Sequence, residues 1–181
     1  MVLSACYIVK NEEKTLARSL ASIQSDVDEI VVVDTGSVDA TKAAAQSFGA
    51  TVVDFVWQDD FAAARNQALE LAKGDWVLFL DADEYVSAST RGKLRQIIES
   101  QSEKDVLLLT MRNIDSETGE ELLTFSAPRL FRHKKSFRYA GRIHEQLLDA
   151  GQPIQQVAWI PGSELCLLHT GYSAQLAPVK A

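Results

Sequence analysis

The segment WVLFLDADE, residues 76–84, runs from five consecutive apolar residues directly into a group of carboxylates. The apolar run predicts a buried β-strand, and residues two apart in extended chain point to the same side, so Asp81 and Asp83 can converge on one point. Two carboxylates at the carboxyl end of a strand can bind a hard divalent cation and leave positions for diphosphate oxygens. The alternative is a polar turn in which Asp83 or Glu84 caps a following helix.

The composition favours one domain and argues against a nucleic-acid partner. The 181 residues are 46% hydrophobic, which is enough for a single domain with a full core. A net charge of −7 and a pI near 5.0 oppose binding to a phosphate backbone. An anionic substrate would therefore need a local cation, which a metal at Asp81 and Asp83 would supply.

Cysteine usage and the N-terminus bear on the cellular location. Cys6 and Cys166 each lie in an apolar, strand-like run, which predicts two reduced core thiols and a cytoplasmic protein. The apolar segment 1–9 is short and has no basic leader, so we predict neither a signal peptide nor a transmembrane segment. Peripheral contact with a membrane remains compatible with the sequence.

The first half of the chain alternates strands and helices. Continuous β-branched runs such as residues 30–33 are typical of parallel strands covered on both faces. The pattern predicts an α/β fold with a mainly parallel sheet and right-handed crossovers. The expected strands span residues 2–9, 30–33, 51–55 and 75–80, and the expected helices span residues 12–25, 38–48 and 61–72.

The second half has a different pattern. A helix over 88–100 and a strand over 105–111 are followed by short β-rich segments that glycines and prolines, among them Pro128, interrupt. This predicts a mixed or antiparallel edge that could build an acceptor pocket. We therefore expect one domain over 1–181, with a nucleotide-binding half (1–100), an acceptor-side half (101–172) and a frayed tail (173–181).

Polar residues follow each of the first four predicted strands, and the carboxyl ends of parallel strands meet at one edge of a sheet. The coincidence of polar residues at one edge favours a metal site at Asp81 and Asp83 over a simple polar turn. The residues are Asn11 and Glu12, then Asp34, then Asp59, Asp60 and Arg65, and finally Asp81 and Asp83.

These motifs, in this order, resemble glycosyltransferase family 2 enzymes of the GT-A fold. The likeness extends over nearly the whole chain and is greatest to a bacterial branch whose members often carry helical, TPR-type repeats; such repeats are absent here. The motifs are IVKNEE (8–13), DTGSVDAT (34–41), FAAARN (61–66), LDADE (80–84), RLFR (129–132), GRIHE (141–145) and HTGY (169–172).

The resemblance implies a nucleotide site. Asp34 would hydrogen-bond the nucleotide, usually through the base, with Val9 and Asn11 beside the base or ribose. The alternative role of Asp34 is to cap the following helix, for which Ser37 is better suited. Arg65 would reach back to the nucleotide or to Asp81, or else form a surface salt bridge with Glu12 or Asp60.

The resemblance also implies a metal and a catalytic base. Asp83 would be the direct ligand of Mn²⁺ or Mg²⁺, Asp81 would contact ribose or water on the metal, and His169 is the candidate third ligand. Glu145 would be the general base that deprotonates the acceptor, with His144 sharing or replacing that role. The alternative is that His144 and Glu145 have no catalytic role and merely pair with Arg142 or Arg138.

A basic group surrounds the last motifs and has two interpretations. It could hold a diphosphate or an anionic acceptor, or it could be a solvated loop. Its members are Arg129, Arg132, His133, Lys134, Lys135, Arg138 and Arg142.

The resemblance thus implies an inverting glycosyltransferase. It would move a sugar from a nucleoside-diphosphate sugar, with UDP the expected nucleotide, to a hydroxyl of a carbohydrate, lipid or protein. One alternative is a degenerate or truncated domain that only binds a nucleotide or a partner. A nucleotidyltransferase is less favoured, because KNEE (10–13) is not the glycine- and arginine-rich loop of those enzymes. A haloacid-type phosphatase is disfavoured because Tyr85 replaces the expected threonine or valine.

Overall fold

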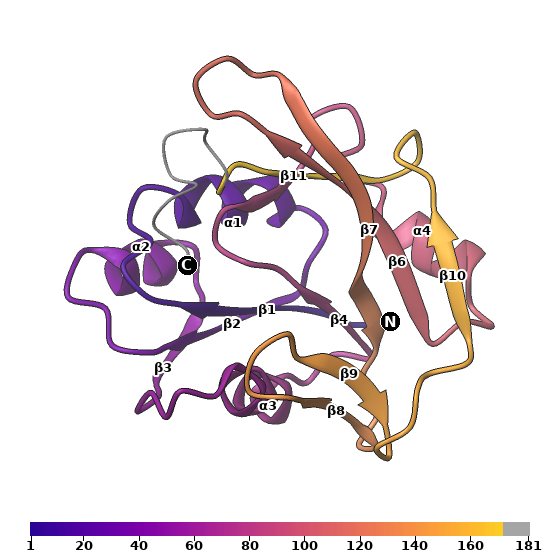
Figure 1. Cartoon of the computed structure of the whole chain (residues 1–181), viewed down its shortest axis with the longest axis horizontal. Helices are drawn as coiled ribbons and strands as arrows, with labels where there is room; N and C mark the ends of the chain where they lie inside the picture. The colour runs from indigo at the N-terminus through magenta and orange to yellow at the C-terminus, as the bar shows by residue number, and fades with distance from the viewer. Residues whose placement is uncertain (172–181) are drawn as a thin grey trace.

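A computed structural model describes residues 1–171, and within them one mixed sheet of nine strands organises the molecule (Figure 1). The predicted tail, 173–181, lies outside the described residues. The sheet begins with four parallel strands in the order β3-β2-β1-β4 and continues through β7, β6, β11 and β5, while β10 also pairs with β6. This confirms the predicted α/β architecture with a mixed sheet.

The parallel half contains β1 (Leu3–Val9), β2 (Glu29–Asp34), β3 (Thr51–Asp54) and β4 (Trp76–Phe79). Their side chains alternate between two cores with a period of two: Ile30 and Val32 enter one core, and Val31 and Val33 enter the other. Helices α1 (Leu16–Ile23) and α2 (Thr41–Ser47) cover the first face, and α3 (Phe61–Leu71) covers the second (Figure 1). Both faces are therefore buried, as the continuous apolar strands predicted.

The second half completes the same sheet. Strand β7 (Glu121–Arg132) pairs antiparallel with both β4 and β6 (Val106–Ile114). Strands β10 (Val157–Ile160) and β11 (Cys166–His169) follow one another along the other edge of β6, and both are parallel to it. A separate hairpin of β8 (Phe137–Ala140) and β9 (Gln146–Asp149) lies next to α3 (Figure 1).

One prediction in this region is wrong, and the alternative of a helix cap at Asp83 or Glu84 is excluded. The helix expected over 88–100 is only α4 (Leu94–Ser100), and the residues after Asp83 form the short strand β5 (Glu84–Val86). The cause is long-range: β5 pairs antiparallel with β11, and the Ser87 amide donates to the Cys166 carbonyl. Neither Asp83 nor Glu84 therefore caps a helix.

Pro128 does not break its strand. β7 passes through it with a register shift, because Leu107 faces Leu130 while Leu108 faces Pro128. A bulge accommodates a proline that cannot donate to the ladder, and it leaves Arg129 as the extra residue. The bulge gives Arg129 a direction that a regular strand would not.

Cys6 and Cys166 are both buried and free, as predicted for reduced core thiols. Within residues 1–171, no helix combines the length and apolar character needed to span a membrane.

Candidate functional site

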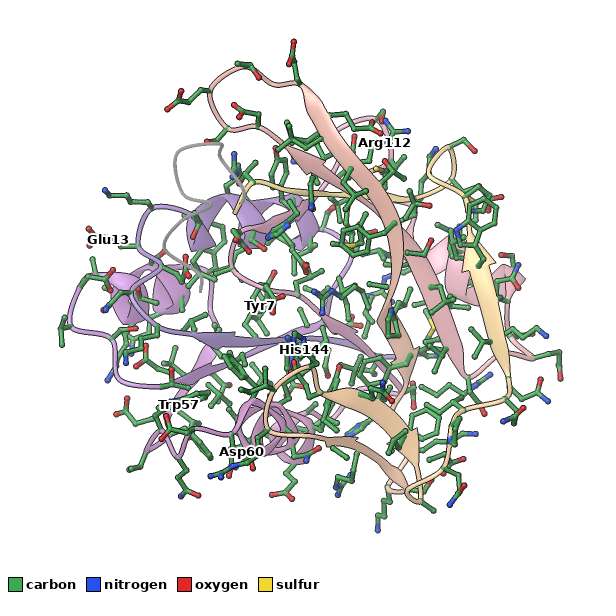
Figure 2. The ribbon with its side chains drawn as sticks, in the orientation of Figure 1. Tyr7, Glu13, Trp57, Asp60, Arg112 and His144 are labelled. Atoms are coloured by element: carbon green, nitrogen blue, oxygen red, sulfur yellow. The ribbon has the colours of Figure 1, made fainter. Side chains whose placement is uncertain are left out.

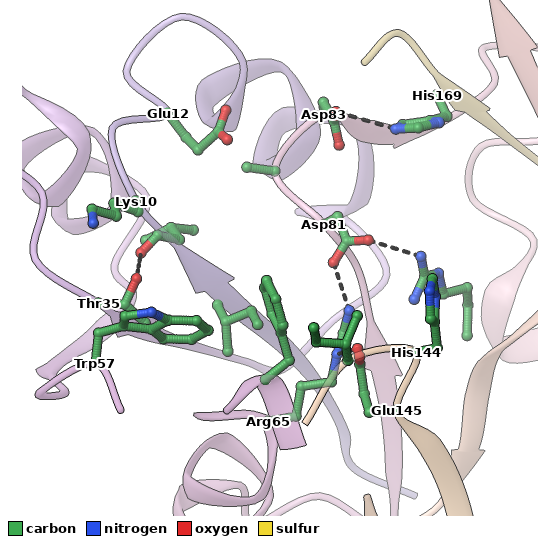
Figure 3. A pocket seen from close by; sticks show the side chains of 16 residues that line it. Lys10, Glu12, Thr35, Trp57, Arg65, Asp81, Asp83, His144, Glu145 and His169 are labelled. Atoms are coloured by element: carbon green, nitrogen blue, oxygen red, sulfur yellow. Dashed lines mark hydrogen bonds and ion pairs between the residues drawn. The ribbon is translucent and has the colours of Figure 1, made fainter. Parts of the chain in front are cut away.

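A cavity of about 790 Å³ opens at the carboxyl ends of β1, β2 and β4 (Figure 3). This volume lies within the range of about 300–1,000 Å³ that is typical of small-molecule sites. The cavity contains seven of the nine predicted site residues. Its lining comprises Ile8, Val9, Lys10, Glu12, Thr35, Trp57, Phe61, Arg65, Asp81, Ala82, Asp83, Arg129, Ile143, His144, Glu145 and His169.

Asn11 and Asp34, the other two predicted residues, are not part of the lining; Asn11 is exposed and Asp34 is buried. Asn11 has a positive φ of 56°, and its side-chain oxygen accepts from the Val38 amide at 2.9 Å. Asp34 Oδ1 accepts from the Gly36 and Ser37 amides at 2.9 and 2.7 Å. The other oxygen, Oδ2, is buried with no hydrogen-bond partner among the described residues. A buried carboxylate oxygen in this state is suited to accept a bond from a ligand.

Ser37 does not cap α2. That helix begins after Ala40 with no side-chain cap, and the Ser37 hydroxyl accepts from the Asn11 amide at 2.9 Å. The loops after β1 and β2 are thus bonded to each other, which fixes the shape of this end of the cavity.

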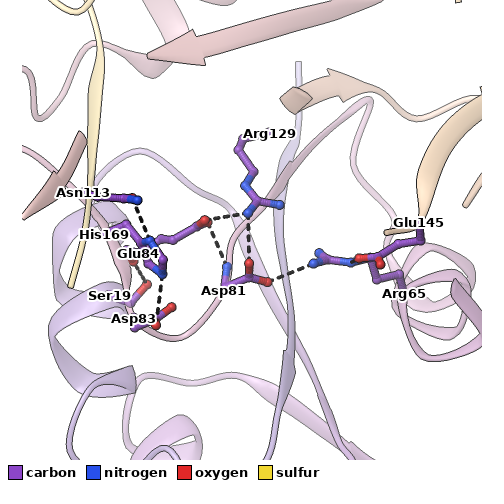
Figure 4. A network of polar contacts seen from close by, with 9 residues as sticks. All are labelled: Ser19, Arg65, Asp81, Asp83, Glu84, Asn113, Arg129, Glu145 and His169. Carbon is purple, nitrogen blue, oxygen red and sulfur yellow. Dashed lines mark hydrogen bonds and ion pairs between the residues drawn. The ribbon is translucent and has the colours of Figure 1, made fainter. Parts of the chain in front are cut away.

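A buried ion network surrounds Asp81 (Figure 4). We call Arg65, Asp81, Glu84, Arg129 and Glu145 the Asp81 network. Arg65 donates from Nη2 to Asp81 Oδ1 at 2.9 Å and from Nε to Glu145 Oε1 at 2.6 Å. Arg129 Nη2 donates to Asp81 Oδ2 at 2.9 Å and to Glu84 Oε1 at 2.5 Å. Both oxygens of Asp81 are therefore engaged by arginines.

Burial and charge act in opposite directions within this network. Burial by itself would raise the pKa of Asp81, but the charges of Arg129 and Arg65 lower that pKa well below its usual range. Glu84 is only 2% exposed, and burial raises its pKa although Arg129 opposes the shift. Asp81 therefore remains ionised and is balanced by protein cations.

Arg65 is held in an aromatic cage. Its guanidinium carbon lies 4.6 Å from the ring centre of Phe79 and 5.4 Å from that of Tyr139. The residue is 6% exposed, so the alternative of a surface salt bridge is wrong, and the predicted contact with Asp81 is present. Burial raises the pKa of Tyr139 to about 12.

Asp83 faces a different partner (Figure 4). Its Oδ2 lies 3.1 Å from His169 Nε2, and His169 Nδ1 lies 2.9 Å from the side-chain oxygen of Asn113 on β6. We call Asp83 and His169 the Asp83 pair. Burial lowers the pKa of His169, but the hydrogen bond to Asp83 and the nearby carboxylates outweigh it, so the pKa is raised.

The Asp83 pair suits a divalent cation held by two protein ligands. A proton on Nδ1 bonded to Asn113 leaves Nε2, the nitrogen nearest Asp83, to face a metal. Among residues 1–171 no three His, Cys, Asp or Glu side chains form a metal-binding group. The structure therefore brings together Asp83 and His169 but not Asp81, the other residue predicted at the metal, whose oxygens face Arg65 and Arg129.

Glu145 and His144 lie on the loop between β8 and β9. Gly141 and His144 both have positive φ, 101° and 57°, which turns this loop over the cavity. Glu145 pairs with Arg65 rather than with the two arginines of the alternative interpretation. Of those, Arg142 donates to the Gln58 carbonyl at 3.2 Å and Arg138 to its neighbouring carbonyl.

The seven basic residues around the last motifs do not act together: one lines the cavity, and others bond to neighbouring parts of the fold. Of the seven, only Arg129 lines the cavity. Lys134 lies 2.6 Å from Asp105, and both ring nitrogens of His133 lie about 3 Å from carbonyl oxygens, those of Gly74 and Leu69. The group is therefore not a continuous anion-binding surface.

Trp57 and Asn113 are site residues that were not predicted from the sequence, whereas Arg129 and Glu84 were expected in other roles. Trp57 lines the cavity beside α3 (Figure 2), its Nε1 donates to Asp59 at 2.9 Å, and its ring meets Phe61 edge-on with centroids 4.9 Å apart. Its place directly after a parallel strand was an available signal.

Comparisons with known proteins identify the family of this chain. A family model described as glycosyl transferase family 2 matches residues 4–150. The TPR repeat-containing protein Synpcc7942_0270 of Synechococcus elongatus is 39% identical over 155 residues, which cover 85% of this chain and 37% of the relative. The SPbeta prophage-derived glycosyltransferase SunS of Bacillus subtilis is 30% identical over 144 residues, which cover 78% and 34%. The chain thus spans about a third of the length of these relatives.

The similar solved structures include two that hold UDP or a UDP-sugar. Staphylococcus aureus TarS 1–349 in complex with UDP-GlcNAc matches with a TM-score of 0.75 and 20% identity over 96% of this chain and 59% of that chain, which confirms the GT-A fold. Glucosyl-3-phosphoglycerate synthase from Mycobacterium tuberculosis, in complex with Mg²⁺ and UDP, matches with a TM-score of 0.52 and 26% identity. That match covers 61% of this chain and 44% of the synthase.

Proposed function

This chain belongs to glycosyl transferase family 2, and from that premise we propose that its cavity binds a nucleoside-diphosphate sugar and transfers the sugar to an acceptor hydroxyl with inversion. The observation that carries the proposal is the order of groups along one cavity. Val9, Thr35 and Trp57 line one end, Asp81 and Asp83 line the middle, and residues 144–145 line the side formed by β8–β9.

The first end suits the nucleoside. Asp34 Oδ2, which has no described partner, would accept from an N–H of the base or a hydroxyl of the ribose. Trp57 offers an aromatic face of the kind on which bases stack. UDP is the expected nucleotide, because both similar solved structures hold UDP or a UDP-sugar.

The middle of the cavity suits the diphosphate. Asp83 and His169 would hold a divalent cation, and Mg²⁺ or Mn²⁺ is the expected ion, since the mycobacterial synthase was solved with Mg²⁺ and UDP. When bound, the cation would neutralise charge that develops on the departing diphosphate. Asp81, fixed by two arginines, would accept from a donor hydroxyl such as that of the ribose.

Glu145 is the proposed general base. The acceptor oxygen would form a bond to the anomeric carbon while the bond from that carbon to the diphosphate oxygen breaks, and the hydroxyl proton would pass to Glu145. Arg65 holds Glu145 Oε1 at 2.6 Å, which sets the orientation of the carboxylate. His144 on the same loop is the second candidate.

The division into a donor half, 1–100, and an acceptor half, 101–172, is part of this proposal. So are a carbohydrate, lipid or protein acceptor and a cytoplasmic location. The alternative of a degenerate binding domain predicts nucleotide binding without transfer.

The test combines binding with turnover. We expect a thermal shift of several degrees with one nucleoside diphosphate and Mn²⁺, and a smaller shift with chelator, since a ligand at a hundred times its Kd adds about 2.7 kcal/mol. Glu145→Gln should lower the slow hydrolysis of the donor sugar by about 10²–10⁴-fold while the thermal shift persists.

The matched control is Glu99→Gln, which makes the same change at an exposed position of α4. Binding without any donor hydrolysis in the wild-type protein would support the degenerate domain. If His144→Gln lost hydrolysis and Glu145→Gln kept it, the base would be His144.

A further inference from the structure

We propose that Gly171 provides the space that a cation needs between Asp83 and His169, so that a larger residue at this position would exclude the cation. The inference rests on the proposed function, because it concerns the same metal. It assigns a role to a residue that lies outside the two candidate ligands.

The geometry of Gly171 carries the proposal. A β-carbon added to it would lie 2.1 Å from Asp83 Oδ2 and 2.8 Å from His169 Nε2, two atoms that are themselves 3.1 Å apart. Oxygen ligands of Mg²⁺ lie at about 2.0–2.1 Å from the ion. The first atom of any side chain at position 171 would therefore lie as close to Asp83 Oδ2 as a bound cation would, and would compete with a cation for the space beside this pair.

Backbone conformation does not account for the glycine. Six other glycines have positive φ and nothing near the place of an added β-carbon, or only atoms at ordinary distance, as at Gly141. Gly171 is outside that left-handed region, so an L-residue could adopt its backbone. What distinguishes it from those six is the close approach of its backbone to two polar side chains.

The backbone beside Gly171 is also anchored. The Thr170 amide donates to the Asp83 carbonyl at 3.3 Å, and the Thr170 hydroxyl accepts from Arg18 on α1 at 2.6 Å. His169 pairs with Glu84 in the β11–β5 ladder. Because residues 169–170 are held from two sides, an added β-carbon would displace the Asp83 carboxylate rather than move the chain away.

The test measures Mn²⁺ binding directly, by the electron paramagnetic resonance signal of free Mn²⁺ with UDP present. We expect Gly171→Ala to weaken Mn²⁺ affinity at least tenfold while UDP binding in chelator stays within twofold of wild type. The matched control is Gly162→Ala, where the added β-carbon meets only the Thr110 and Arg112 side chains at 3.1 Å or more. Its Mn²⁺ affinity should not change.

A second variant guards against misfolding. If Gly171→Ala lowers the Tm, the clash with Asp83 is the expected cause, so Asp83→Ala/Gly171→Ala should return to the Tm of Asp83→Ala. If the Tm of the double variant stays below that of Asp83→Ala, the clash is not with the Asp83 side chain. Gly171 would then have a purely structural role, and the inference would be overturned.

The remaining outcomes separate the two proposals. Wild-type Mn²⁺ binding that Gly171→Ala retains would overturn the role of Gly171 and leave the proposed function standing. No binding of Mn²⁺ with UDP by the wild-type protein would overturn the metal-dependent function, and the role of Gly171 with it.

Discussion

Asp81 and Asp83 follow the same strand, two residues apart, but the protein surrounds them differently. Both oxygens of Asp81 accept from arginines, a buried one on α3 and a half-buried one at the bulge in β7. Asp83 Oδ2 meets His169, whose other ring nitrogen is fixed by Asn113. The Asp81 network is balanced by protein cations, whereas the Asp83 pair is an imidazole beside a carboxylate, the two groups that we propose hold the metal.

The difference shows that a two-carboxylate motif does not by itself define two metal ligands. The role of each carboxylate depends on what distant elements bring to it. We therefore expect a change to the Arg129–Glu84 pair of the Asp81 network to affect mainly stability, and changes at the Asp83 pair to affect mainly metal-dependent binding.

The largest effect should come from Arg129→Met. It leaves Glu84, 2% exposed, without its ion-pair partner and removes one of the two partners of Asp81. Breaking a buried ion pair costs about 3–5 kcal/mol, because an uncompensated charge remains buried. Urea unfolding should show a loss of that size.

Arg112→Met is the matched control for this prediction. Arg112 pairs with Glu121 at 3.6 Å on the β6–β7 hairpin, away from the cavity, and both side chains are exposed (Figure 2). Its removal should cost less than about 1 kcal/mol. Adding Glu84→Gln to Arg129→Met should recover part of the loss. Equal costs for the two arginines would contradict a buried network.

The next largest effect should come from Asp83→Ala, measured as affinity for the nucleotide. Removal of a proposed ligand should weaken Mn²⁺-dependent binding of UDP by about a hundredfold or more, since changes to groups that only orient ligands cost 10–100-fold. The free energy of unfolding should fall by far less than in Arg129→Met. Calorimetric titration of UDP, once with Mn²⁺ and once with chelator, measures the metal-dependent affinity. Wild-type affinity in this variant would show that Asp83 is not a metal ligand.

The parallel half of the fold was predictable because its signals are local. Apolar runs such as residues 30–33 are buried on both faces, and each is followed by a helical period. Helix ends were less predictable. The helix expected from residue 12 begins at Leu16, because the Glu12 amide donates to the Thr41 hydroxyl at 2.7 Å, a contact that no local pattern contains.

The second half and the partners in the site depend on long-range pairing. Residues 84–86 form a strand because they pair with β11, which lies more than 80 residues later in the sequence. Arg129 reaches Asp81 across 48 positions because Pro128 forces a bulge, and Asn113 reaches His169 across 56. The family resemblance supplied His169 as a candidate, but neither spacing nor composition indicated which carboxylate it would meet.

The smallest effect concerns the aromatic cage of the Asp81 network. The Tyr139 hydroxyl is buried with no hydrogen-bond partner among the described residues, whereas the equally buried Tyr7 hydroxyl lies 2.9 Å from Ser19 Oγ. Tyr139→Phe should therefore leave the free energy of unfolding near pH 7 unchanged or slightly raised. Tyr7→Phe, the matched control, should lower it by about 1 kcal/mol.

The same pair of variants makes a prediction about pH. Burial raises the pKa of Tyr139 to about 12, above the value near 10 of an unfolded tyrosine. The folded state then keeps a proton that the unfolded state loses, so this contribution to stability is complete below about pH 10 and disappears as the pH rises towards 12. Across that window wild type should lose up to about 1.4 kcal/mol per pH unit more than Tyr139→Phe, in urea unfolding series from pH 9 to 11.5. Parallel curves would mean that Tyr139 is ionised as readily in the folded chain as in the unfolded one, and that the cage around Arg65 is open to water.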